Sequence, residues 1–271
     1  MAFKDILLHM DNSPSCPERL DLAVNLASAH GAHLKGLYVI SHSYYASRQS
    51  VGESEVATLQ QLFTEKTARA GISAEWICSD WPVVGVSTTE IITLYAYYSD
   101  LVIIGQPDHS DSISTTPPDL PERLGLGAGR PLLVVPYAGN YSTTGDRVMV
   151  AWKAGRESAR AVNDAMPFLE RARHVSIVTV GNSEVPDSAA ERAGLQLCAY
   201  LACHRIAARL EHIFAASGFP IGDLLLNHAC DQKMDLLVTG AFGQSRRGAF
   251  MLGPVAGHLL NHMTLPVLIS H

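Results

Sequence analysis

The two halves of the amino-acid sequence repeat each other, and this repetition constrains the fold more than any other feature. The clearest pair is DLVIIG at residues 100–105, which returns as DLLVTG at residues 235–240. Four segments recur in the same order: 6–10 with 148–152, 23–27 with 161–165, 100–105 with 235–240, and 131–135 with 266–270. Because chance does not produce such a shared order, the chain is predicted to be a tandem duplication.

The two copies are joined by a segment that is typical of a linker. Residues 137–145 are rich in Gly, Ser, Thr and Asn, which favour turns and loops. The chain has 271 residues, and at about 150 residues per domain this length predicts roughly two domains. We therefore predict a first domain over residues 1–139 and a second over residues 146–271.

Within each copy, apolar runs alternate with segments of helical periodicity, which predicts an α/β fold. In the second copy the predicted strands are 147–152, 175–180, 236–239 and 266–270, and the predicted helices are 157–171, 190–216, 222–233 and 255–262. The strand runs are apolar on both faces, as expected for a parallel sheet covered by helices on both sides. In such doubly wound domains, ligands bind beyond the carboxyl ends of the strands, where the strand order reverses.

Charge and composition exclude several classes of function. The chain has 20 Lys and Arg residues against 26 Asp and Glu, a formal charge of −6, so it lacks the basic excess that neutralises nucleic-acid phosphates. No apolar run approaches the ~18 residues that a membrane span needs. The first eleven residues lack the apolar core of a secretory signal and the five cysteines are thinly spread, so we expect a cytoplasmic protein.

A glycine-rich loop in the second copy is the strongest chemical signal. Gly240 and Gly243 follow a predicted strand, and Gly253 and Pro254 open a predicted helix nine residues later. Glycine lets the backbone approach a ligand closely, and a helix start presents free N–H groups to an anion. The intervening segment adds hydroxyl and guanidinium groups: Ser245, Arg246 and Arg247. This pattern indicates a phosphate-binding loop, although an ordinary strand-to-helix loop with solvated arginines fits the spacing as well.

The glycine spacing resembles the nucleotide-binding signature of the universal stress protein family, Gly-x2-Gly-x9-Gly followed by Ser or Thr. Residues 148–152 and 155–158 resemble the beginning of such a domain, and residues 235–268 resemble its end. The resemblance implies two Rossmann-like (adenine nucleotide alpha hydrolase-like) domains, each a mostly parallel five-stranded sheet flanked by helices. It also implies an internal pseudo-dimer in which the last strands of the two copies pair or pack together, with further homodimerisation left open.

The resemblance implies an adenine-nucleotide site in the second domain, for ATP or for ADP or AMP. The ligand would contact the glycine loop, the helix that follows it, and the ends of the first two strands. The residues concerned are Trp152, Lys153, Val180, Gly240, Gly243, Ser245, Arg246, Gly253, Pro254 and Val255.

Each copy departs from the family pattern in a different part of this site. In family members that bind ATP, the first strand usually ends in an aspartate beside the ribose and adenine. The first copy keeps this residue as Asp11 but has no glycine motif after Gly105. The second copy keeps the glycines but has Lys153 at the aspartate position and Pro254 where the motif has a hydroxyl residue. Because an ammonium only donates hydrogen bonds and Pro254 lacks an N–H, we expect weak ATP binding or selectivity for another anion.

Neither a metal site nor a catalytic residue is predicted. Cys198 and Cys203 lie about 140° apart around a helix, and His258 and His262 share a helix face without a visible third ligand. Three functions stay open. They are a nucleotide-sensing stress or regulatory protein, a nucleotide-free scaffold that acts through contacts with an unidentified protein, and an enzyme limited to slow ATP hydrolysis without an evident base.

Overall fold

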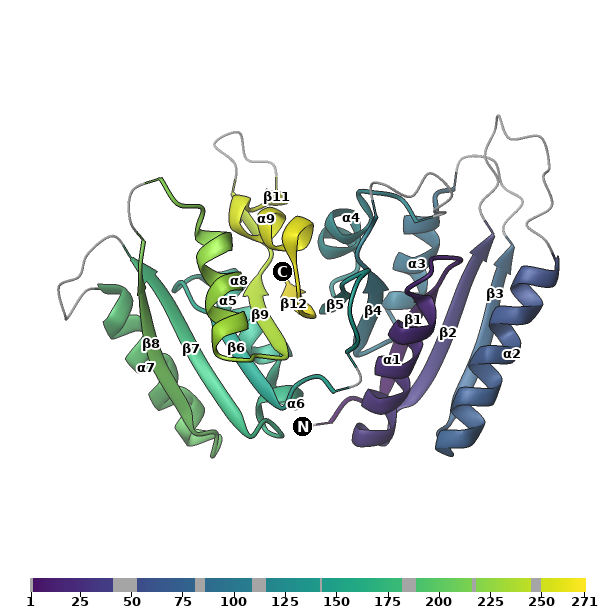
Figure 1. The fold of residues 1–271 in the computed structure, drawn as a ribbon, viewed down its shortest axis with the longest axis horizontal. Helices are drawn as coiled ribbons and strands as arrows, with labels where there is room; N and C mark the ends of the chain where they lie inside the picture. Colours follow the sequence, from purple (N-terminus) through teal and green to yellow (C-terminus); the bar gives the residue numbers. More distant parts are fainter. Residues whose placement is uncertain are drawn as a thin grey trace. The chain divides into compact units, whose positions relative to one another are not determined.

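The computed structural model describes residues 2–40, 53–80, 86–108, 116–141, 143–181, 189–215, 218–244 and 250–271. It divides the chain into two compact units, Ala2–Ser142 and Thr143–His271. In each unit, strands alternate with helices (Figure 1). The predicted α/β class is therefore confirmed.

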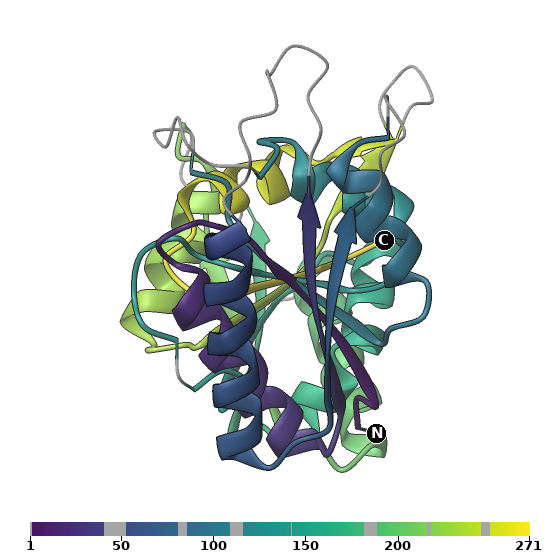
Figure 2. The same ribbon diagram turned by 90° about the vertical axis from the view of Figure 1, so that its right-hand side faces the viewer.

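The first unit is a parallel sheet between two layers of helices. Its elements are β1 (Asp5–Met10), α1 (Cys16–His30), β2 (His33–Ile40), α2 (Glu53–Ala70), β3 (Ala74–Asp80), α3 (Thr88–Ala96), β4 (Leu101–Gly105), α4 (Leu120–Gly127) and β5 (Leu132–Val135). The strand order is β3-β2-β1-β4-β5, and the neighbours pair in parallel. Helices α1 and α2 cover one face and α3 covers the other (Figure 2). The order reverses between β1 and β4.

The second unit has the same topology. Its elements are β6 (Arg147–Ala151), α5 (Arg156–Asp164), α6 (Met166–Leu169), β7 (His174–Gly181), α7 (Ala189–Cys203), β8 (Ala208–Phe214), α8 (Ile221–Asp231), β9 (Leu236–Gly240), β10 (Phe242–Gln244), β11 (Phe250–Leu252), α9 (Pro254–His262) and β12 (Val267–Ser270). The order β8-β7-β6-β9-β12 is again parallel throughout. Here the order reverses between β6 and β9.

Two predicted helices of the second unit were wrong in extent. The segment 157–171 divides at Ala165 into α5 and the short α6, because Pro167 cannot supply the N–H that a continuous helix would need there. The segment 190–216 is helical only as far as Cys203, and Ala208–Phe214 forms the edge strand β8. Arg205, with φ of 63°, lies in the left-handed region and turns the chain from helix to strand.

The repeated aspartates before β4 and β9 explain why this part of the sequence occurs twice. Asp100 accepts hydrogen bonds from the backbone N–H groups of Lys4 and Asp5, at 2.7 and 3.1 Å. Asp235 accepts them from Gly145, Asp146 and Arg147, at 2.9 to 3.1 Å. Each carboxylate thereby holds the start of the first strand of its unit beside the start of the fourth.

Candidate functional site

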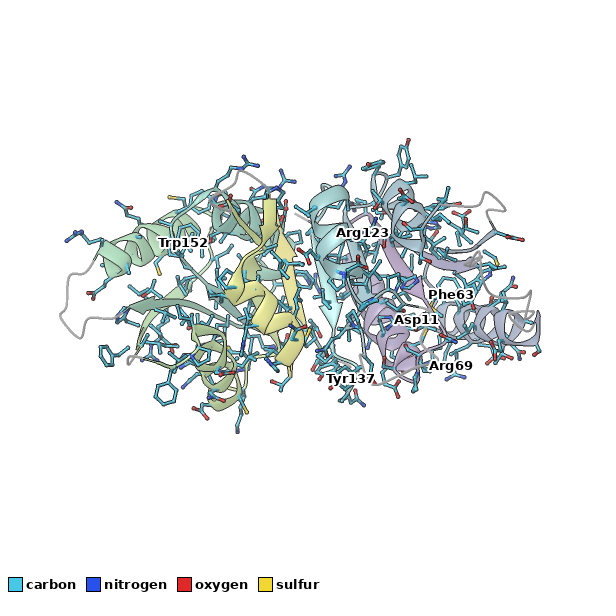
Figure 3. The ribbon with its side chains drawn as sticks, turned by 90° about the horizontal axis from the view of Figure 1, so that it is seen from above. Asp11, Phe63, Arg69, Arg123, Tyr137 and Trp152 are labelled. Carbon is cyan, nitrogen blue, oxygen red and sulfur yellow. The ribbon has the colours of Figure 1, made fainter. Side chains whose placement is uncertain are left out.

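A small polar pocket lies at the strand-order reversal of the first unit, which is where ligands bind in sheets of this type. Its volume is about 110 Å³, and loops that follow β1, β4 and β5 contribute to it. It is lined by Asp11, Ser13, Pro14, Ser15, Gln106, Asp108, Thr116 and Tyr137. Figure 3 labels two of these residues, Asp11 after β1 and Tyr137 after β5. Sequence reasoning placed the main site in the other unit and did not identify this pocket.

Asp11 lies at the base of this pocket and is engaged by the protein's own groups. Its Oδ1 lies 2.8 Å from the Arg19 guanidinium, and both side chains are buried. Oδ1 also accepts hydrogen bonds from the backbone N–H and the hydroxyl of Ser13. Oδ2 accepts one from the Thr116 hydroxyl at 3.0 Å. The carboxylate that the family pattern offers to a ligand is thus bound internally in this unit.

Arg19 is the residue that changes the character of this site. It is 1% exposed and also donates from Nε to the carbonyl of His9 at 3.3 Å. Gly105, at the end of β4, makes room for it, because a Cβ there would lie 2.1 Å from the guanidinium. Burial alone would raise the pKa of Asp11, but the charge of Arg19, the contact with His9 and the hydrogen bond from Ser13 together outweigh it, so that pKa lies well below its usual range.

His9 completes the buried cluster behind the pocket. Burial lowers the pKa of His9 to about 4, against the opposing effect of the Asp11 carboxylate, whose Oδ2 lies 3.7 Å from Nδ1. The imidazole is therefore neutral at pH 7. The buried charges of the cluster are then one carboxylate and one guanidinium, which compensate each other.

The strand register identifies the residues that take these places in the second unit. Ile6 of β1 lies opposite Leu101, and Val148 of β6 lies opposite Leu236, the repeat partner of Leu101. Counting on from these pairs, Lys153 takes the place of Asp11, as the sequence indicates. It is exposed at the carboxyl end of β6.

The repeated helix segment identifies the residue of the second unit that corresponds to Arg19. Matching residues 23–27 with 161–165 places Glu157 of α5 at the position of Arg19 in α1. The contacts of the two repeated glycines support this equivalence. A Cβ at Gly105 would meet Arg19, and a Cβ at Gly240 would meet Glu157. The acid and base of the first unit are thus exchanged in the second, where Glu157 is only partly buried.

The structure explains why one glycine of the predicted loop must be glycine, but not the other. A Cβ on Gly240 would lie 2.8 Å from the backbone of Glu157 and Ser158, so packing of α5 against β9 requires glycine there. Gly253 has φ of −64° and ψ of 150°, which any residue adopts. The nearest atom to a Cβ on Gly253 is the Ala241 carbonyl oxygen at 3.7 Å. The fold therefore explains Gly240 but leaves Gly253 without a packing reason.

Much of the predicted phosphate-binding loop is an antiparallel ribbon. Strands β10 and β11 pair with Gly243 opposite Met251, and Phe242 opposite Leu252. The backbone N–H of Gly253 then bonds to the Ala241 carbonyl at 3.0 Å, which closes the ribbon before α9 begins. Of the predicted site residues, Ser245 and Arg246 lie outside the described part of the chain.

The other predicted site residues lie at the carboxyl ends of β6 and β7 and at the start of α9. Trp152 follows β6, is partly buried, and donates from Nε1 to the Ala193 carbonyl of α7 at 3.2 Å. Val180 is the second-to-last residue of strand β7 and is partly exposed. Pro254 and Val255 form the first turn of α9, and Gly253 caps it.

The described residues show neither a metal-binding cluster nor a membrane-spanning helix. They contain no group of three or more His, Cys, Asp or Glu side chains that could hold a metal ion. His258, one of the two paired histidines, instead lies 2.6 Å from the Asp223 carboxylate of α8 through Nε2. Among the helices in these parts of the chain, none combines the length and apolar character of a membrane span.

Each unit is a parallel, doubly wound sheet with loops at the strand-order reversal, which defines a protein of Rossmann-like fold. Residues 145–271 match the model of the universal stress protein family. The second unit is therefore a universal stress protein domain, as its residues indicate. No curated protein matches the chain in sequence.

Solved structures extend the likeness to both units. A universal stress protein from Archaeoglobus fulgidus covers 98% of this chain and 97% of its own, with 16% identity and a TM-score of 0.68. A putative universal stress protein from Pseudomonas aeruginosa covers 99% and 93%, with 18% identity and a TM-score of 0.64. A functionally unknown protein from the same species covers 99% and 92%, with 17% identity and a TM-score of 0.65. At these identities the matches establish the fold, with its two successive units.

Proposed function

We propose that this protein acts in a stress response and binds ATP, or a related adenine nucleotide, in its second unit. The proposed site is the carboxyl end of β6, β7 and β9 together with the start of α9. The observation that carries the proposal is Gly253, a motif glycine that neither its backbone angles nor its packing require. A glycine without a structural reason at a helix start is what close approach of a ligand to the backbone would require.

The start of α9 supports an anionic group in this position. The first intrahelical bond at this end runs from the N–H of Gly257 to the carbonyl of Gly253. The N–H groups of Val255 and Ala256 precede it and have no intrahelical acceptor. Pro254 removes one further donor, but its ring suits the first helical position. A phosphate placed here would receive two backbone hydrogen bonds and the positive end of the helix dipole.

Three side chains at the carboxyl ends of the strands suit the remainder of a nucleotide. Val180 and Trp152 offer apolar surface, and the bond from Trp152 to Ala193 fixes the indole against α7. Lys153 is exposed and supplies a positive charge, which can reach a phosphate but cannot accept a bond from a ribose hydroxyl. We therefore infer that this site binds ATP more weakly than it would with an aspartate at position 153, because the ribose hydroxyls find no acceptor there.

Isothermal titration of the full chain with ATP tests this assignment. A Cβ on Gly253 makes only an ordinary van der Waals contact, with the Ala241 carbonyl oxygen at 3.7 Å, so Gly253→Val should fold normally. Its side chain then blocks the helix start, and we expect at least a tenfold loss of affinity. Gly127→Val is the matched control, because a Cβ on Gly127 lies 3.6 Å from Thr93 and the residue is exposed in the first unit. Equal affinity in wild type and Gly253→Val would contradict the proposal.

A second candidate function rests on exposed apolar side chains near α8. Phe214, Phe219 and Ile221 are 43%, 65% and 39% exposed, respectively, around the connection from β8 to α8. Such a surface favours a contact with another protein, which is the scaffold alternative. The absorbance of nucleotide released from freshly purified, denatured protein distinguishes the two, since a scaffold would release none.

The expected location and assembly belong to the same proposal. All five cysteines fall within the described residues and are free thiols, which suits a reducing compartment such as the cytoplasm. Pairing of the two units across an internal dyad stays a prediction.

A further inference from the structure

Helices α2 and α7 have the same place in their units, and the ends of the two helices fix which residues correspond. α2 packs against β3 of the first unit, and α7 packs against β7 and β8 of the second (Figure 1). After α2, the N–H of Ile72 donates to the carbonyl of Thr67 at 3.3 Å, and after α7 the N–H of Ile206 donates to that of Leu201 at 3.0 Å. Thr67 and Leu201 are therefore corresponding residues, and both are buried.

The outer faces of the two helices differ in polarity at corresponding positions. Three exposed residues of α2 are polar or charged: Gln61, Glu65 and Arg69. The residues that correspond to them in α7 are Leu195, Ala199 and Cys203, which are exposed as well. From position 193 to 203, α7 has no charged side chain. The second unit thus presents an apolar helix face where the first presents a solvated one.

Four exposed residues form a stripe along α7, the α7 stripe. Leu195, Ala199 and Ala202 follow one another at intervals of four and three residues, which places them on the same side of the helix. Tyr200 flanks them, and Leu195 and Tyr200 are 55% and 45% exposed, respectively. The opposite side of the helix is buried. A connected apolar stripe on the solvent side of a helix indicates a contact surface.

The dimensions and the charge of the α7 stripe limit what can cover it. A helix of 15 residues is about 22 Å long and about 10 Å wide, so the stripe has the footprint of one further helix. A charged partner would lose its hydration here without gaining a counter-charge, so the partner surface should be uncharged as well. An α7 helix from a second copy of the chain meets both conditions. Since each copy has a formal charge of −6, two copies repel each other and approach most easily at an uncharged face.

We propose that α7 is a homodimer interface, in which it packs antiparallel to α7 of a second copy about a two-fold axis. Under this symmetry, contact of Leu195 with Ala199 of the second copy implies the reverse contact too. The small Ala199 leaves room for the leucine side chain, as in knobs-into-holes packing, and the helix axes can approach to about 8 Å. None of these residues belongs to the proposed nucleotide site, so the dimer does not depend on it.

Sedimentation velocity of the full chain tests whether the dimer forms. One helix pair covers less than the ~800 Å² per partner of a standard interface, so we expect a weak dimer with a Kd of about 10 μM. Loading concentrations from about 1 to about 500 μM bracket this value. Because salt screens the repulsion between the two negative chains, the dimer should tighten when NaCl is raised from about 50 to about 500 mM.

Matched variants assign the dimer to the α7 stripe. Ala202→Glu places a charge in the stripe and should weaken dimerisation at least tenfold. Ala68→Glu is the control, because Ala68 is the exposed alanine at the corresponding position of α2, and it should leave the Kd within twofold. Leu195→Gln combined with Ala199→Glu gives α7 the residues of α2 and should leave only monomer.

All of the introduced residues are good helix formers, and circular dichroism verifies that each variant is folded. A wild type that stays monomeric at the highest concentration would overturn the proposal. So would a dimer that loosens as salt rises, a dimer that persists in the Leu195→Gln and Ala199→Glu variant, or equal effects of Ala202→Glu and Ala68→Glu.

Discussion

The two units share topology and strand register, yet they exchange acid and base at the same two positions. The first unit has Asp11 and Arg19, whereas the second has Lys153 and Glu157. The first pair is buried at 2.8 Å, and its second-unit counterparts are exposed or only partly buried. Burial rather than residue type thus separates them: an enclosed pair acts within the protein, and exposed charges are available to a ligand.

The largest effect is expected when the buried pair is broken. Arg19→Leu leaves the Asp11 carboxylate buried without its charge partner, which costs about 3–5 kcal/mol of unfolding free energy. Glu157→Gln, at the matching position, should change it by no more than ~0.5 kcal/mol. Denaturant unfolding followed by tryptophan fluorescence in a Trp152→Phe background reports on the first unit, and the Trp152-containing chain reports on both. Similar losses for the two variants would refute the contrast in burial.

Acid should destabilise the first unit through His9. The pKa of His9 falls from 6.5 in the unfolded chain to about 4 in the fold, so the unfolded state binds more protons and stability is lost as pH falls from about 6.5 towards 4. Between pH 7 and pH 4 this residue accounts for roughly 3 kcal/mol. Unfolding curves of wild type and His9→Gln across this range measure the difference. The second unit has Ala151 at the corresponding position and lacks this effect. If the stability of wild type and of His9→Gln fell equally with pH, His9 would not be the cause.

The glycines that end β4 and β9 sharpen the comparison further. Gly105→Ala and Gly240→Ala should each cost about 2 kcal/mol, because each Cβ meets occupied space. The neighbour is a side chain in one case and backbone in the other. Arg19→Leu should therefore remove most of the cost of Gly105→Ala, whereas Glu157→Gln should leave that of Gly240→Ala unchanged. Double-mutant cycles measure the two coupling energies, and equal couplings would mean that the contacts are alike.

The smallest effect concerns the ligand affinity of the second unit. Lys153→Asp with Pro254→Ser restores the family residue types, and we expect ATP to bind at least about tenfold more tightly, equivalent to ~1.4 kcal/mol. Arg171→Asp, exposed in the same unit, controls for the change in net charge. Isothermal titration decides the matter. Unchanged or weaker binding by the double variant would mean that Lys153 and Pro254 belong to a working site for ATP.

The repeated segments predicted the fold well, because the sheet of each unit is built from corresponding apolar strands. Strand β8 was missed, since the Ala-rich helix before it continues the helical periodicity and only the left-handed Arg205 ends it. Counting on from the paired register places Lys153 where Asp11 lies in the first unit. Local sequence patterns were therefore enough to predict those strands and helices whose own residues determine where they begin and end.

The pocket of the first unit could not be predicted in the same way. Its residues come from three loops that are distant in the sequence, with Ser13, Asp108 and Tyr137 as examples. In the sequence PERLD, Arg19 resembles a solvent-exposed helix residue. No neighbouring residue in the sequence predicts that it is buried beside Asp11. A buried ion pair is a property of the assembled unit, and a single sequence carries no local signal for it.

The carboxylates of Asp100 and Asp235 also bear on how the chain is made. Asp235 bonds to backbone groups 88 to 90 residues earlier, and Asp100 to groups 95 and 96 residues earlier. The centre of each sheet therefore cannot close until most of its unit has left the ribosome. The long chain segments that must be brought together make this a slow step. Because domains fold as units during synthesis, the first unit can complete its sheet while the second is still being translated.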